Sequence, residues 1–188
     1  GTIARALARH FGFAHLDTGL LYRAVGAKGG DPVQAARSLT PDDLAREDLR
    51  SAAAGQAASR VAAIPEVRAA LTEFQRAFAR TEPGAVLDGR DIGTVIAPDA
   101  PAKLYIAASP EVRAERRWKQ LTARGEVIAF EDMLEDIRRR DARDAGRDDA
   151  PMVQADDAVL LDTTDLGIEA AFDAARRIVE AARARHGL

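Results

Sequence analysis

Two acids and an arginine, Asp88, Arg90 and Asp91, lie within four residues of the chain, directly after a short apolar run. The run, Ala85–Leu87, predicts a buried strand, and the Asp-Gly pair after it predicts the turn that ends this strand. In open α/β sheets the ligand binds beyond the carboxyl ends of the strands, which is where these side chains are expected. A solvated turn without function is the alternative interpretation.

Arginines elsewhere in the chain indicate which ligand such a sheet edge could bind. Arg23 closely follows Asp17-Thr18-Gly19, and several arginines lie between Arg140 and Arg147. A planar guanidinium can donate two parallel hydrogen bonds to a phosphate, so this pattern favours phosphate recognition. A surface salt bridge is the alternative for Arg140 and Arg147.

The region 116–149 is dense in charges of both signs, which is typical of a solvated, salt-bridged helix pair. We accept this interpretation for four of its residues, which are Glu131, Asp132, Glu135 and Arg138.

The composition limits the class of protein. A length of 188 residues suits one compact domain with a small insert. A formal charge of −3 gives no global field for nucleic acid, and no apolar run approaches the ~20 residues of a membrane span. There is no cysteine, which fits a reducing compartment, and no signal peptide is visible. We expect a cytoplasmic monomer without a nucleic-acid or membrane partner.

Strand and helix patterns alternate along the chain, which predicts an α/β fold with a parallel sheet and crossover helices. The expected strands are the apolar runs at 13–16, 85–87, 103–107 and 158–162. Helices are expected over 1–12, with Gly12 as the stop signal, after Asp17-Thr18-Gly19, and at the end of the chain. Further helices are expected to begin at Thr40-Pro41, Ser51, Pro65, Ser109-Pro110 and Phe130, with Thr40 and Ser109 as N-cap residues. Residues 28–63 show no period-2 run, so this segment is expected to be short and helical.

Two local patterns are expected to belong to the core. In the helix that begins at Pro65, apolar residues recur at helical spacing and predict a buried stripe made of Val67, Leu71, Phe74 and Phe78. His15 stands in an apolar run, without a nucleophile or metal ligands beside it in sequence. We expect it to pack rather than to catalyse.

Several motifs, taken in chain order, resemble one known family. They are Leu16-Asp17-Thr18-Gly19 with Tyr22-Arg23, then Leu87–Thr94 followed by Pro98–Pro101, and finally Arg140–Arg147. Together they look like cytidylate (CMP) kinase, a family of nucleoside monophosphate kinases, and the likeness covers nearly the whole chain. The resemblance implies a three-layer P-loop kinase-like fold, in which helices flank a parallel sheet.

The resemblance also implies how one kinase domain, 1–188, would be divided. Its core would comprise 1–27, 64–115 and 150–188. A short helical acceptor-binding insert would cover about 28–63, and a helical lid about 116–149.

The family's functional residues carry over onto matching positions of this chain. The acceptor phosphate and its transfer are assigned to four arginines, Arg23, Arg90, Arg140 and Arg147. Binding of the acceptor nucleoside is assigned to Asp17, Thr18, Ser59, Arg68, Asp91 and Asp144, with Asp144 at the ribose. Arg143 could help or form a surface ion pair.

Base selection would follow from hydrogen-bond chemistry. Cytosine presents an amine beside two acceptors, so Asp91 could accept from the amine while Arg68 and Ser59 donate. Uracil has a carbonyl in place of the amine and would be repelled by the carboxylate. Outside the resemblance, Ser59 and Arg68 are ordinary helix-surface residues.

The resemblance assigns ATP binding to Gly1 and Thr2, as the last residues of a Gly-x-x-Gly-x-Gly-Lys-Gly-Thr loop. Mg²⁺ would accompany ATP, with no direct protein ligand and Asp88 in contact through water. The rest of that loop and the strand before it are absent from residues 1–188. We therefore expect little or no turnover by this chain itself, and we expect that Ala85–Leu87 and Leu104–Ala107 do not pair with each other.

Three functions are compatible with these residues. The first is ATP-dependent phosphorylation of CMP and dCMP to CDP and dCDP. The second is a non-catalytic pyrimidine nucleotide-binding module that has lost the phosphate loop. The third is a kinase for another nucleoside monophosphate.

Overall fold

The computed structural model describes residues 1–146, 148 and 151–188. Its elements are α1 (Thr2–Phe11), β1 (Ala14–Asp17), α2 (Thr18–Lys28), α3 (Pro32–Arg37), α4 (Pro41–Ala45), η1 (Glu47–Arg50), α5 (Ala52–Val61), α6 (Pro65–Ala79), β2 (Ala85–Asp88), η2 (Ile92–Ile96), β3 (Leu104–Ala107), α7 (Pro110–Thr122), α8 (Phe130–Ala145), β4 (Val159–Asp162) and α9 (Ile168–Arg185). The predicted α/β class is confirmed, and 28–63 is helical as expected.

The start and stop signals in the sequence act as predicted. Gly12 ends α1 in the left-handed region at φ 69°. Thr40 and Asp43 form a reciprocal capping box at the start of α4. The Ser109 hydroxyl accepts a hydrogen bond from the Val112 amide at 3.3 Å, with Pro110 at the first helical position of α7. These signals are local, so they need no tertiary contact to operate.

The strands form two parallel pairs. β1 pairs with β2, in register from Ala14 opposite Ala85 to Asp17 opposite Asp88. β3 pairs with β4 from Leu104 opposite Val159 onward. No ladder joins β2 to β3 within the described residues, which confirms the expectation that these two strands do not pair. Both carboxylates, Asp17 and Asp88, therefore stand at one sheet edge.

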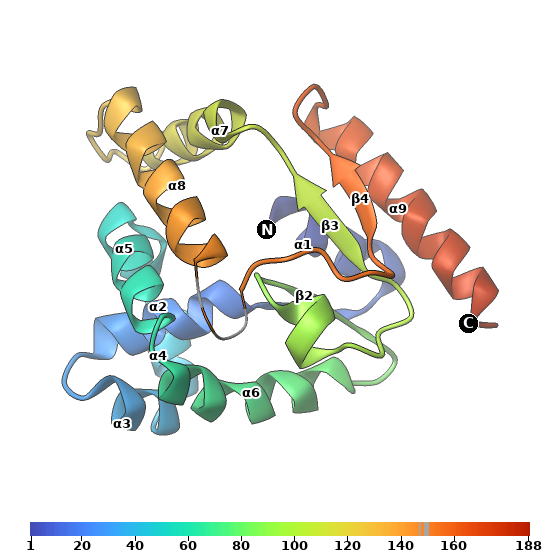
Figure 1. Cartoon of the computed structure of the whole chain (residues 1–188), viewed down its shortest axis with the longest axis horizontal. Coiled ribbons are helices and arrows are strands. Elements are labelled where there is room, and N and C mark those ends of the chain that lie inside the picture. Colours follow the sequence, from blue (N-terminus) through green and yellow to red (C-terminus); the bar gives the residue numbers. More distant parts are fainter. Residues whose placement is uncertain (147, 149–150) are drawn as a thin grey trace.

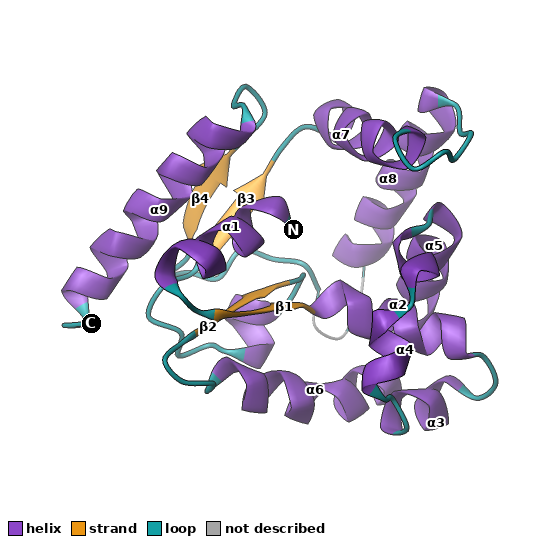
Figure 2. Ribbon diagram, turned by 180° about the vertical axis from the view of Figure 1, so that it is seen from behind, coloured by secondary structure: helices purple, strands orange, loops and turns teal. Residues whose placement is uncertain are grey.

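Helices cover both strand pairs. In Figures 1 and 2, α1 lies between the β1–β2 pair and α9, and α6 runs along the opposite side of β2. One apolar cluster joins α2, α3 and α6 around Leu21, Val25 and Leu71. A second cluster holds α7 against α8 through Leu121 and Met133. The two clusters build the helical walls on either side of the β2 carboxyl end.

The predicted stripe on α6 is wrong at one position. Val67 and Leu71 are buried, and Phe78 is half-buried, but Phe74 is 48% exposed. Gln75 is 1% exposed and occupies the core position instead, because it lies four residues after Leu71 on the same helix face. Its side-chain amide donates to the Leu71 carbonyl at 3.2 Å.

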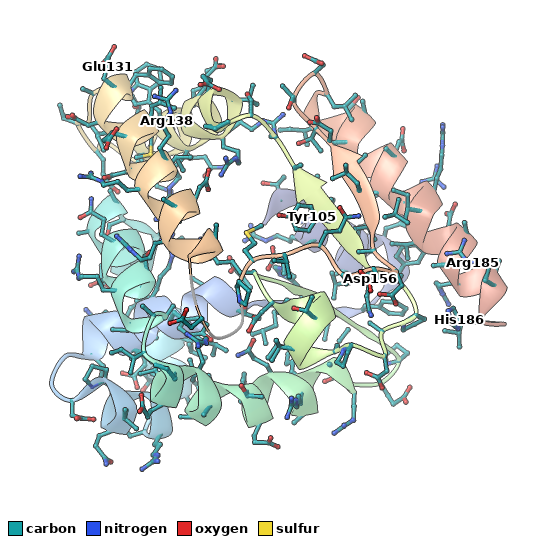
Figure 3. All side chains as sticks on the ribbon, in the orientation of Figure 1. Tyr105, Glu131, Arg138, Asp156, Arg185 and His186 are labelled. Carbon is teal, nitrogen blue, oxygen red and sulfur yellow. The ribbon has the colours of Figure 1, made fainter. Side chains whose placement is uncertain are left out.

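Ion pairs join α7 to α8. Arg113 donates to both carboxylate oxygens of Asp141, at 2.8 and 2.6 Å. Arg138 donates to Glu111 at 2.9 Å, with about half of each side chain exposed. Glu131, at the far tip of α8, points away from the rest of the molecule (Figure 3). The exposed surface role expected for Glu131 and Arg138 is confirmed. Within the described residues, no helix combines the length and apolar character that a bilayer crossing needs.

Candidate functional site

A cavity of about 430 Å³ opens at the carboxyl ends of β1 and β2. Such a volume is in the range of small-molecule sites. Ten of the residues assigned from sequence line it, namely Gly1, Thr2, Asp17, Thr18, Arg23, Ser59, Arg68, Arg90, Asp91 and Arg140. These residues come from distant parts of the chain, and the fold brings them to one place.

The floor of the cavity is shaped by contacts between the ends of the two strands. Asp17 caps α2 by accepting a hydrogen bond from the Gly19 amide at 3.0 Å. The Thr18 hydroxyl donates to the Asp88 carbonyl at 2.8 Å. A Cβ at Gly89 would lie 2.2 Å from that hydroxyl oxygen, so only glycine fits the turn after β2. The Asp-Gly turn thus allows α2 to approach the strand end.

Arg23 projects from α2 and is held by main-chain carbonyls. Its Nη1 donates to the Leu49 carbonyl at 2.6 Å and to the Ser51 carbonyl at 3.4 Å. Burial, followed by repulsion from Arg117 and Arg140, lowers the pKa of Arg23 to about 10. The side chain is therefore oriented by neutral groups and retains its positive charge for another partner.

Arg140 and Arg117 approach from α8 and α7. Burial lowers the pKa of Arg140, and the neighbouring Arg90 lowers it further. Burial likewise lowers the pKa of Arg117, whose Nη2 donates to the Arg50 carbonyl at 2.8 Å. Crowding of like charges in a partly desolvated space disfavours the empty cavity and favours an anion within it.

Arg90 and Asp144 form an ion pair with each other, in which Arg90 Nε donates to a carboxylate oxygen of Asp144. Asp144 is 3% exposed and is not among the cavity-lining residues in the described part of the chain. The residues expected at the phosphate and at the ribose are thus neighbours. Arg147, the fourth predicted arginine, lies outside the described residues.

The three residues expected to read the base line the cavity together. Ser59 and Arg68 are 7% and 6% exposed, and Arg68 donates to the Ala62 carbonyl at 2.7 Å. Asp91 follows the β2 turn on the same cavity wall. Arg143 of α8 donates to the Ser59 hydroxyl, so it contacts the group that is expected to read the base.

A comparison with known proteins assigns this arrangement to a family. The family model described as cytidylate kinase matches residues 32–182. The chain belongs to the cytidylate kinase family. The cytidylate kinase of Caulobacter vibrioides is 63% identical, over all of this chain and 93% of the relative. Those of Caulobacter sp. K31 and Cereibacter sphaeroides are 61% and 62% identical, over 100% and 98% of this chain and 91% of each relative.

The cavity is also lined by four arginines that the family motifs do not mark, namely Arg5, Arg50, Arg117 and Arg124. One of them carried a detectable signal. Arg117 stands three residues after Ala114 and four before Leu121, both fully buried, so it occupies the apolar face of α7. A charged residue on a core-facing position is a stronger site indicator than charge density alone.

The surroundings of Asp88 bear on metal binding. The described residues hold no group of three carboxylate, histidine or cysteine side chains that could enclose a metal ion. Asp88 stands beside Gly1, and its Oδ1 lies 3.5 Å from His15 Nε2. The half-buried His15 has its pKa lowered, chiefly by burial. A single acid of this kind suits a cation that keeps its own water shell.

Proposed function

We propose that this protein is a kinase that transfers the terminal phosphoryl group of ATP to CMP and dCMP, producing CDP and dCDP. The observation that carries the proposal is one cavity in which an arginine cluster adjoins the trio Ser59, Arg68 and Asp91. Membership of the cytidylate kinase family supports the same reaction.

In this proposal the arginine cluster binds and activates the acceptor phosphate. Phosphoryl transfer asks the protein mainly to position the two nucleotides and to stabilise charge on the moving group. Arg23 and Arg90 are fixed by Leu49 and Asp144, so they are oriented before the substrate arrives. Arg140, with Arg147 as its expected companion, adds positive charge from α8.

The trio is proposed to select cytosine. The Asp91 carboxylate accepts from the exocyclic amine, while Arg68 and Ser59 donate to the two ring acceptors. Arg143 would hold the Ser59 hydroxyl in place for this contact. A uracil carbonyl facing Asp91 would meet like partial charge, so UMP should be a poor acceptor.

We further propose the division into a core, an insert of about 28–63 and a lid of about 116–149. Contacts between the two helical parts support a closing lid. Glu126 accepts from the Ala52 amide at 3.3 Å, and Gln56 donates to Asp136 at 2.9 Å. In such a closed arrangement Asp144 lies near the ribose hydroxyls, and Asp17 and Thr18 line the pocket floor.

For the donor nucleotide, Gly1 and Thr2 are proposed to contact the phosphates at the start of α1. The ATP-bound Mg²⁺ neutralises phosphate charge, and Asp88 would accept hydrogen bonds from its water shell. The enzyme is proposed to act as a cytoplasmic monomer on free nucleotides.

Steady-state kinetics of the full-length gene product would test this function. We expect CMP and dCMP to be phosphorylated at roughly 1–100 per second, with UMP and AMP disfavoured in kcat/KM. Asp99→Ala, on the exposed loop between η2 and β3, is a control that should leave this ranking unchanged. A preference for UMP or AMP over CMP would overturn the proposal.

A further inference from the structure

Gly55 stands at an unexpected place in α5. The helix is built largely from alanine, yet it has a glycine at the centre of the run Ala52–Ala58. Glycine lowers helix stability relative to alanine, because the backbone loses more freedom on folding. Gly55 is buried and has helical neighbours on both sides, so neither a turn nor a cap explains it.

The space around Gly55 is filled by two guanidinium groups. A Cβ built on Gly55 would lie 3.1 Å from Nη2 of Arg140 and 3.2 Å from Nη2 of Arg23. Its third nearest neighbour would be Cζ of Arg23, at 3.7 Å. Both guanidinium nitrogens lie close to this one point, so they also lie close to each other. The missing side chain lets arginines from α8 and α2 sit side by side.

A second glycine shows what ordinary helix packing looks like in the same region. A Cβ at Gly26 of α2 would lie 2.9 Å from the Ala57 Cβ and 3.2 Å from the Ala57 main-chain carbon. Gly26 thus allows the helices α2 and α5 themselves to approach. Gly55 differs from it, since the three nearest atoms all belong to charged side chains of the cavity.

We propose that Gly55 is a positioning residue for the acceptor phosphate, and that its missing side chain seats Arg140 beside Arg23 as a two-arginine clamp. This inference rests on the proposed function and deepens it. Neither guanidinium gains from the proximity of the other in an empty cavity, since like charges repel. The arrangement becomes favourable when a phosphate dianion lies between them and accepts from both.

The clamp separates phosphate binding from base binding, and this makes it testable. Gly55→Ala adds one methyl group against the two guanidiniums, which must then move apart. We expect CMP affinity, measured by calorimetry, to fall by about ten-fold or more, as for the loss of a charge-assisted hydrogen bond. Affinity for cytidine, which lacks the phosphate, should stay within about two-fold of wild type, because Ser59, Arg68 and Asp91 are untouched.

Gly26→Ala is the matched control, because it adds the same methyl group to a packing contact. It should lower the unfolding temperature while leaving the ratio of CMP to cytidine affinity unchanged. Gly55→Ala should keep its unfolding temperature, since alanine is the better helix former. Equal losses of CMP and cytidine affinity in Gly55→Ala, or no loss of CMP affinity, would overturn the clamp.

A double variant decides whether Gly55 acts through Arg140. In an Arg140→Ala background, Gly55→Ala should cause a clearly smaller loss of CMP affinity, because one of its two contacts is gone. The same loss in both backgrounds would contradict the inference. Failure of the wild-type chain to prefer CMP over UMP would instead contradict the proposed function, so the two failures are distinct.

Discussion

Two arginines of the cavity, Arg23 and Arg117, have different partners from two arginines of the α7–α8 surface, Arg113 and Arg138. Arg113 and Arg138 form ion pairs with Asp141 and Glu111 at the surface. Arg23 and Arg117, on the cavity side, donate to main-chain carbonyls, and Arg23 has Arg117 and Arg140 as charged neighbours. Hydrogen bonding to Asp141 raises the pKa of Arg113, whereas burial lowers the pKa of Arg23 to about 10.

This difference shows how one residue type serves two purposes. An exposed ion pair satisfies both partners and holds two helices together, but it leaves no charge for a ligand and contributes little to stability. A carbonyl orients a guanidinium without neutralising it, so its field remains directed into the cavity. For these four arginines, the presence of a carboxylate partner separates the surface pair from the cavity pair. Arg90 is the exception within the cavity, because it pairs with the buried Asp144.

The largest expected effect comes from removing a fixed cavity arginine. Arg23→Ala or Arg90→Ala should lower kcat of the full-length gene product by at least ~10²-fold, because a preorganised charge at the transferred group is lost. Steady-state turnover of CMP measures this. A small loss of kcat in Arg90→Ala together with a large loss in Arg138→Ala would contradict the assignment of Arg90 to the site and of Arg138 to the surface.

Removing the Asp91 carboxylate, which is proposed to bind the cytosine base, should change the selectivity between CMP and UMP. Asp91→Ala should lower kcat/KM for CMP more than for UMP, and should thereby reduce the ratio of the two values by about ten-fold. The reason is that a site built around a substrate hydrogen bond rejects analogues that lack it. Asp99→Ala serves as the control on an exposed loop. Equal losses for both nucleotides would give Asp91 a structural role.

A smaller effect is expected at Arg143, which contacts the substrate site only through Ser59. Arg143→Ala should weaken CMP binding about five-fold, the scale of one hydrogen bond of this kind. Calorimetric titration against Arg139→Ala, whose partner is Asp136 on the same helix, provides the comparison. An unchanged affinity would mean that Ser59 needs no support from α8.

The smallest effect is expected at the surface. Arg138→Ala removes an exposed ion pair with Glu111 and should leave both turnover and the unfolding temperature unchanged within error. Kinetic assays and thermal unfolding of the same preparation measure both. A loss of turnover would extend the functional surface to the outer side of α8.

Much of the fold was predictable because its signals are local. The Thr40 and Ser109 caps and the Gly12 stop depend on side chains within three residues, and each occurs where it was expected. The π-helical turn η2 was not predicted, since no local pattern marks it and Ile96 is buried only through tertiary packing. Phe74 is exposed and Gln75 takes the core position, because a helical stripe fixes a face only to within about one residue.

The candidate site was predictable where motifs name its residues and not where packing selects them. Ten assigned residues line one cavity. Two of them, Ser59 and Arg68, could be assigned only through the family resemblance, because their own sequence pattern does not mark them. Arg117 lies in a segment rich in charge, where charge density alone does not mark it, and its signal is its place between Ala114 and Leu121 on the buried face of α7. Gly55 acts by lacking a side chain, and its importance depends on Arg23 and Arg140, which are distant in sequence.

The central claim is that the cavity keeps positive charge ready for a phosphate, and that this charge lowers the stability of the ligand-free protein. Thermal unfolding of Arg140→Ala, with and without CMP, tests this claim most directly. The ligand-free variant should unfold at no lower temperature than wild type, because a buried like charge has been removed. The increase in unfolding temperature that CMP gives the wild-type chain should be largely lost. A lower ligand-free unfolding temperature together with an undiminished CMP shift would contradict the claim.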